Sequence, residues 1–254
     1  MIDERILLGF PIDFKDICQV YPPTVNDVVG NKDFGIYQSL FTMTQEELDK
    51  AFLQDEKVNQ VPTPFQYLLI NYYQDEKIRN KIHEAFTFFI HEPVTIVPEI
   101  EMLLIGKSED ELDPNVDLEE PRLLTEENFF DFQNIVRKVM GMEDEKKPDS
   151  EEENLDSRIK RYKMKIKQSE EILKKKRAKN APTLGTLLTA ICCMGIGLNP
   201  LNIGEISYAC VHWLISMEQQ KEEYDIDIRA LLAGADSKKV KPKYWIKNID
   251  EKEL

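Results

Sequence analysis

The sequence SEEENLDSRIKRYKMKIKQSEEILKKKRAK at residues 150–179 is the clearest fold signal in this chain of 254 residues. Ser150 and Glu153 have the spacing of a capping box, which predicts that a charged helix begins there and runs over 151–179. Apolar residues recur through it at steps of four and three, at Leu155, Ile159, Tyr162, Ile166 and Leu173. Such spacing gives a helix one narrow apolar seam, and a seam of this kind needs a partner.

The charge of the chain changes sign within this segment. Residues 143–156 hold eight acids and two lysines, whereas residues 158–179 hold eleven bases and two acids. Acids at the start of a helix and bases at its end both favour the helix dipole, and Asp156 lies four residues before Lys160. A solvent-exposed charged helix that packs on the rest of the protein through one apolar stripe is enough to explain why the acids precede the bases. An excess of bases above an apolar seam also fits a partner helix in the same chain or another, although Ser169 interrupts the seam.

The net charge of −14 restricts the classes of partner. Outside residues 143–179 the chain carries −17, which repels nucleic acid and anionic membranes. Binding to nucleic acid would depend on the basic helix alone, where Tyr162 is the one aromatic side chain available for stacking. The longest apolar run, at 184–198, is about fifteen residues and falls short of the roughly 20 that span a bilayer. With no signal-peptide pattern at the N-terminus, we expect a cytoplasmic protein.

Start signals for helices recur along the chain and predict a mainly α fold, a helical bundle. Capping boxes begin at Thr44, Thr63, Ser150 and Asn202. Thr125 is expected to cap a helix over 126–140, and residues 78–90 show a helical apolar face that Pro93 must end. The one strand signal is a small β-hairpin near 94–105. Residues 1–40, punctuated by proline and glycine, read as irregular, and only Phe14–Val20 and Val25–Val29 could form short elements.

Composition divides the chain into three parts. We predict a mainly helical N-terminal domain at 1–141, an acidic linker at 142–150 and a helical C-terminal region at 151–254. That region holds the charged amphipathic helix and a long apolar helix over 203–233, which Gly234 ends as a C-cap. One face of the long helix is either core or a groove for a helix of another chain. Its candidate contact residues, with one from the tail, are Trp213, Met217, Tyr224, Ile228 and Trp245.

Metal-binding motifs are incomplete in this sequence. His83 and Glu84 begin the pattern of a zinc-protease helix, but Thr87 stands where the second histidine is required. Cys192 and Cys193 are adjacent, whereas zinc pairs normally have two or more residues between the cysteines. We therefore predict no metal site and interpret these thiols as small hydrophobic groups of the core.

Catalytic motifs are absent from the sequence as well. Gly195 and Gly197 begin like a dinucleotide fingerprint, but the third glycine and a preceding strand are missing, so a helix C-cap is the better interpretation. No P-loop occurs, and no pair of acids is singled out by position. We expect a binding protein, with no enzymatic activity and no cofactor.

Several segments resemble a known family. Residues 224–236, YDIDIRALLAGAD, and 241–246, KPKYWI, are similar to the C-terminal end of tail assembly chaperones of long-tailed phages that infect Gram-positive bacteria. Residues 10–18, FPIDFKDIC, with YPPTV at 21–25, and FFIHEPV at 88–94 resemble the same group.

This resemblance implies a helical, non-enzymatic protein of the infected cell's cytoplasm. Such a protein holds the tape-measure protein in soluble form and recruits tail-tube subunits. A structural or scaffold component of the phage particle and a nucleic-acid-associated regulator remain as alternatives. The candidate contacts with a partner are the seam residues of 155–173 together with the five residues named from the long helix and the tail.

Overall fold

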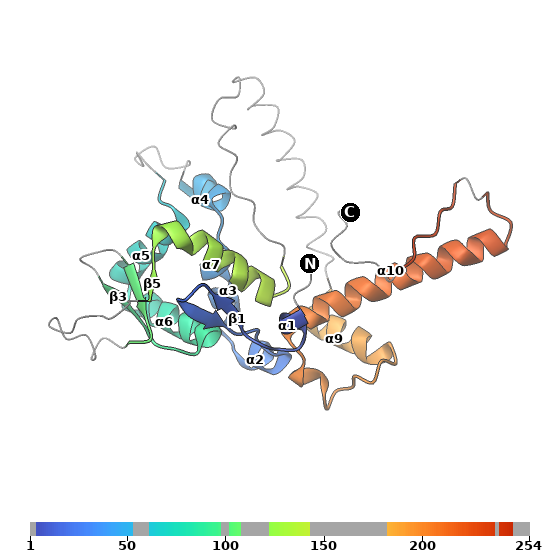
Figure 1. Ribbon diagram of the computed structural model, residues 1–254, viewed down its shortest axis with the longest axis horizontal. Helices are drawn as coiled ribbons and strands as arrows, with labels where there is room; N and C mark the ends of the chain where they lie inside the picture. The colour runs from blue at the N-terminus through green and yellow to red at the C-terminus, as the bar shows by residue number, and fades with distance from the viewer. Residues whose placement is uncertain are drawn as a thin grey trace, which may run out of the picture. The chain divides into compact units, whose positions relative to one another are not determined.

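The computed structural model describes residues 4–52, 61–97, 102–107, 122–142, 182–236 and 239–245 (Figure 1). The predicted charged helix at 151–179 lies outside these residues, with its seam of Leu155, Ile159, Tyr162, Ile166 and Leu173 and most of the linker at 142–150. Described residues up to Met142 and from Asn199 onward form one compact unit, and residues 182–198 belong to a second. The predicted domain division therefore stays a prediction.

Helices dominate the described residues, as predicted, and two small antiparallel sheets accompany them. The helices are α1 (Glu4–Leu7), α2 (Val25–Gly30), α3 (Phe34–Thr42), α4 (Gln45–Phe52), α5 (Pro64–Gln74), α6 (Glu76–Ile90), α7 (Glu126–Val139), α9 (Leu184–Cys193), the 3-10 turn η4 (Ile203–Glu205) and α10 (Tyr208–Leu232). The strands are β1 (Ile12–Phe14), β2 (Cys18–Val20), β3 (Val94–Val97), β4 (Met102–Ile105) and β5 (Leu123–Leu124). Among the described helices, none is long and apolar enough to cross a membrane.

Two of the predicted capping boxes are formed by hydrogen bonds at helix starts. Thr44 Oγ1 accepts from the N–H of Glu47 at 3.1 Å, and the Glu47 carboxylate accepts from the N–H of Thr44 at 3.0 Å. Thr63 and Gln66 exchange the same two bonds, each 3.2 Å long, and α5 begins at the predicted Pro64. Each box satisfies two backbone N–H groups that a helix start leaves without partners, which fixes where these helices begin.

The predicted hairpin near 94–105 is confirmed as β3 and β4, paired antiparallel with Val94 opposite Ile105. The sequence did not predict β5, which adds a third strand through Leu103 and Leu124. A strand of two residues is too short to show an alternating pattern, so tertiary pairing decides it. Beside it, the Arg122 guanidinium binds the Glu92 carboxylate at 2.5 Å.

The prediction that residues 1–40 are mostly irregular is wrong, although the short elements allowed at Phe14–Val20 and Val25–Val29 do correspond to β2 and α2. They form α1, a hairpin of β1 and β2 with Phe14 opposite Cys18, and the helices α2 and α3. The prolines lie between these elements, where proline does not interrupt backbone hydrogen bonding. Helix α2 also starts with a capping box, between Thr24 and Asp27, which proline-rich surroundings obscured in the sequence.

Aromatic side chains fill the centre of the first unit. Helices α3, α6 and α7 pack on one another there, and α7 also contacts both strands of the first hairpin. Fully buried phenylalanines of these elements make up the aromatic core: Phe14, Phe41, Phe86, Phe89, Phe129 and Phe132. Their rings meet mostly edge to face, as for Phe41 and Phe132 at a centroid distance of 5.6 Å.

Helix α10 begins five residues later than the predicted long helix. Residues 203–205 form the 3-10 turn η4, and Ile206 is extended, so Ser207 becomes the N-cap and accepts from the N–H of Cys210. The break occurs because residues 206–208 pair with the segment before α2. Val25 N–H donates to the Ile206 carbonyl at 3.0 Å, and Tyr208 N–H donates to the Pro23 carbonyl at 2.8 Å.

Candidate partner-binding site

Helix α10 is anchored at its first turn and exposed beyond it. Ala209, Cys210 and Val211 are its buried residues, and the helix packs against α1 and α7 in the same unit (Figure 1). The contact with α7 is close, because a Cβ on Gly141 would lie 2.9 Å from the Cα of Ala209. From His212 to Leu232 every side chain is half-buried or exposed. Beyond the first turn, the side chains of α10 are therefore only partly covered by the rest of the protein.

An apolar stripe runs along α10 with alternating steps of four and three residues. We call the α10 stripe the set Cys210, Leu214, Met217, Lys221, Tyr224, Ile228 and Leu231. Apart from the buried Cys210 these side chains are half-buried, whereas Glu222, Glu223 and Arg229, on other sides of the helix, are exposed. Steps of four and three over three heptads are the pattern of a coiled-coil seam. Lys221 is the one polar side chain in it.

The structure places the predicted contact residues of the long helix on or beside this stripe. Met217, Tyr224 and Ile228 belong to the stripe, and Trp213 lies next to Leu214 at its border. Trp245 is half-buried in the tail, where the neighbouring Tyr244 ring meets the Tyr224 ring edge to face at 5.8 Å. Their role in binding stays a prediction. The heptad spacing could have been read from the sequence, but apolar residues on all sides of the first turns obscured it.

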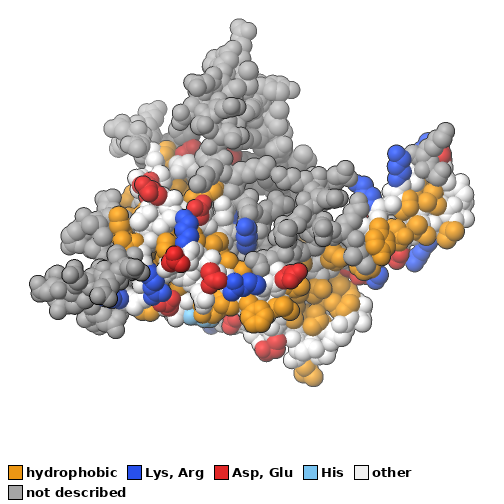
Figure 2. Space-filling model, viewed as in Figure 1, with side chains coloured by type: hydrophobic (Ala, Val, Ile, Leu, Met, Phe, Trp, Pro, Cys, Tyr) orange, Lys and Arg blue, Asp and Glu red, His pale blue; other side chains and the backbone are white. Residues whose placement is uncertain are grey.

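Charged residues border the α10 stripe from Glu218 onward. Glu218 and Asp225 lie along one border, and Gln220 and Asp227 lie along the other. Lys221 bonds to the Glu218 carboxylate at 3.4 Å. Figure 2 shows hydrophobic side chains gathered along α10 with charged side chains beside them. From Glu218 onward, both borders are thus acidic.

Further apolar surface lies at the turn between α1 and β1. Leu8 and Phe10 are 69% and 56% exposed, and the preceding Leu7 is 42% exposed. Helix α1, which precedes this turn, packs on α10.

The cysteines do not all belong to the core, which corrects the prediction for Cys192 and Cys193. Cys18 and Cys210 are buried, Cys192 is half-buried and Cys193 is exposed. Ile191 is the buried residue of α9, and a residue two positions further points to nearly the opposite side of a helix. No group of three potential metal ligands occurs in the described ranges. His83 instead pairs its Nε2 with the Tyr72 hydroxyl at 3.0 Å.

The four thiols should differ in reactivity. Burial raises the pKa of Cys18 to about 12 and also raises the pKa of Cys210, so both are protonated and shielded at pH 8. We expect iodoacetamide at pH 8 to alkylate Cys193 in the folded protein and to reach Cys18 and Cys210 only in denaturant. Peptide mass spectrometry would report the sites. Equal labelling of Cys18 and Cys193 in the folded protein would contradict the burial described here.

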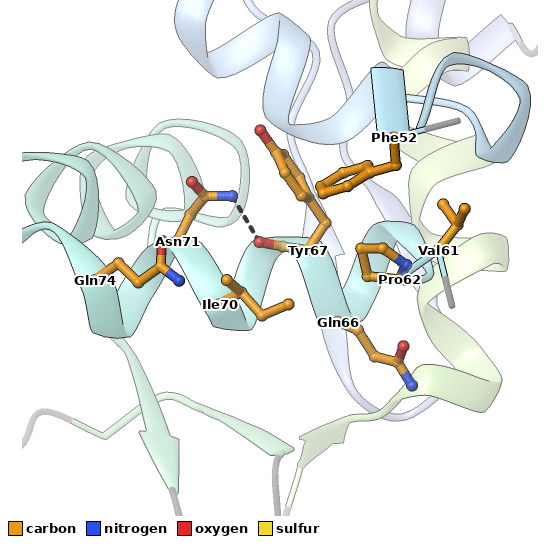
Figure 3. A pocket seen from close by; sticks show the side chains of 8 residues that line it. All are labelled: Phe52, Val61, Pro62, Gln66, Tyr67, Ile70, Asn71 and Gln74. Atoms are coloured by element: carbon orange, nitrogen blue, oxygen red, sulfur yellow. Dashed lines mark hydrogen bonds between the residues drawn. The ribbon is translucent and has the colours of Figure 1, made fainter. Parts of the chain in front are cut away.

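A pocket of about 600 Å³ lies beside α5 (Figure 3). Its described lining is uncharged: Phe52, Val61, Pro62, Gln66, Tyr67, Ile70, Asn71 and Gln74. The Asn71 amide donates to the Tyr67 carbonyl at 2.7 Å and so is held by its own helix. We assign no ligand to this pocket, because residues 53–60, which join Phe52 to Val61, lie outside the described residues.

Comparisons with known proteins bear on the C-terminal part of the chain. No curated protein and no solved structure matches the sequence. Residues 174–250 match a family described as the YomV second domain, a phage-associated name, over less than a third of the chain. The matched residues include α9, η4, α10 and the described part of the tail. The segment that carries the α10 stripe is therefore similar to the YomV second domain.

Proposed function

We propose that this protein is a non-enzymatic phage tail assembly chaperone that acts in the cytoplasm of the infected host. It binds the tape-measure protein, keeps this long helical chain soluble and recruits subunits of the tail-tube protein. The observation that carries the proposal is the half-buried α10 stripe with its heptad spacing, which lies within the residues that resemble a phage-associated domain.

The α10 stripe suits the surface of a long helical chain such as the tape-measure protein. An isolated helix with an apolar seam aggregates unless the seam is covered, since large exposed apolar patches drive association. A stripe at heptad spacing can cover such a seam along its length, as in a helix-in-groove complex. The net charge of −14 keeps the resulting complex soluble.

Co-expression with the tape-measure protein tests the proposal. We expect that protein to be soluble with this chain and insoluble without it, and the two should copurify. Ile228→Asp places a charge in the C-terminal part of the stripe and should abolish the rescue, because an unpaired carboxylate would have to be buried in the interface. The measurement is the soluble fraction of the tape-measure protein after centrifugation, with retained tail-tube protein assayed in the same eluate.

A matched control lies on the same helix. Ile226→Asp introduces the same charge at a position that is 62% exposed and off the stripe, so it should preserve the rescue. Circular dichroism of both variants checks that each is folded. A tape-measure protein that is equally soluble with and without this chain would refute the proposed function.

A further inference from the structure

We infer that the α10 stripe is built for a helix of another protein with an apolar seam and basic borders, and that it disfavours a second copy of this chain. The inference rests on the proposed function in taking the stripe as the binding surface. It adds the chemistry by which a client segment is selected.

The length and spacing of the stripe favour a helical occupant. From Cys210 to Leu231 it extends roughly 32 Å at 1.5 Å per residue. Side chains at alternating steps of four and three form the knobs and holes that a second helix fills. An extended segment presents side chains at a period of two residues and cannot match this spacing over three heptads.

The charges along the stripe favour particular residue types at the border positions of the partner helix. In a coiled coil the residues that border the seam face their counterparts on the partner. Glu218, Asp225 and Asp227 occupy these border positions from the third turn of α10 onward, and Lys221 lies within the seam itself. Lysine or arginine at the partner's borders would meet opposite charges, whereas acids there would meet like charges.

The same charges oppose pairing of two identical α10 helices. In a parallel pair, Lys221 would face Lys221 of the other copy in the seam. In an antiparallel pair, the border that holds Glu218 and Asp225 would face itself, so acid would meet acid. Each orientation of the identical pair therefore brings like charges together, whereas a partner with basic borders avoids both repulsions.

Synthetic peptides can test this selection with the full-length protein. Three labelled helical peptides would share one Leu/Ile seam of four heptads and carry Lys, Gln or Glu at all border positions. We expect the Lys peptide to bind at least tenfold more tightly than the Glu peptide in fluorescence anisotropy at low salt. The preference should shrink as salt is raised, since salt screens the interactions of charges near a protein surface.

Two double variants locate the effect on α10. Asp225→Asn with Asp227→Asn should remove most of the preference for the Lys peptide. Glu222→Gln with Glu223→Gln makes the same change in charge on the outward side of the same helix and should leave the preference intact. If both double variants lower the preference equally, the net charge of the protein is the cause and the inference fails.

Other outcomes separate the inference from the proposed function. Equal binding of all three peptides, lost in Ile228→Asp, would overturn the selection by charge but keep the stripe as the binding surface. Binding of no peptide would overturn the inference, while co-expression still decides the proposed function. A peptide of residues 155–176 that binds more tightly than the designed Lys peptide would assign the stripe to this chain's own segment. A dimer in sedimentation analysis that Ile228→Asp dissociates would assign it to a second copy.

Discussion

Replacing Phe132 with alanine is expected to lower the free energy of unfolding by about 3–5 kcal/mol, the usual cost of Phe→Ala in a core. Phe132 is fully buried, and its ring lies 5.6 Å from both Phe14 and Phe41 and 5.9 Å from Phe86, between centroids. These rings come from β1, α3 and α6, so removal of the Phe132 ring leaves a cavity at the point where the elements meet. The aromatic contacts are lost in addition to the buried area.

Urea titration followed by circular dichroism would measure this change as a lower midpoint. Phe10→Ala is the control, since Phe10 is 56% exposed and its loss should change stability by about 0.5 kcal/mol or less. Phe132→Leu should cost less than Phe132→Ala, because leucine fills part of the cavity. Equal midpoints for Phe132→Ala and Phe10→Ala would show that α7 does not pack as described.

Gly141→Ala should have the second largest effect, a loss of about 2–4 kcal/mol, from backbone strain and overpacking together. Gly141 has a φ of +73°, which side chains other than glycine rarely adopt. An added Cβ would also lie 2.9 Å from the Cα of Ala209, a backbone atom that cannot move without displacing α10. The substitution thus acts on the anchor that holds the α10 stripe to the first unit.

Gly195→Ala separates these two causes. Gly195 has nearly the same φ, +71°, but nothing lies within 4 Å of its added Cβ. It should therefore lose only the backbone strain, about 1 kcal/mol. We further expect Gly141→Ala to increase hydrogen exchange in the first turn of α10, at Cys210, whose N–H is bonded to Ser207. A loss no larger than that of Gly195→Ala, with unchanged exchange, would contradict the close contact of α7 and α10.

Local signals in the sequence were sufficient for the helices that begin with a capping box and continue with an apolar face. Thr44, Thr63 and Thr125 marked starts within a residue of those observed for α4, α5 and α7. The hairpin at β3 and β4 was predictable because one short run of β-branched residues and one short leucine-rich run follow each other there. Local signals were not sufficient for residues 1–40, since the elements there are short and prolines separate them.

The start of α10 shows the limit of local signals most clearly. Asn202 and Glu205 have capping-box spacing, but the helix starts at Tyr208 because Ile206 pairs with Val25. A contact across about 180 positions outweighs a local preference worth about 1 kcal/mol. No pattern of neighbouring residues encodes such a pairing.

The sequence by itself determined that the chain is mainly helical, that it is acidic and that its apolar helices carry narrow seams, because these properties depend on residue type and spacing. Only the tertiary structure decided which apolar face stays accessible, because burial depends on what packs against it. The apolar faces of α3, α6 and α7 are buried in the aromatic core, and the contact between Gly141 and Ala209 buries one turn of α10. The rest of the α10 stripe stays half-buried beyond that anchor, and it is the surface that we propose for a partner.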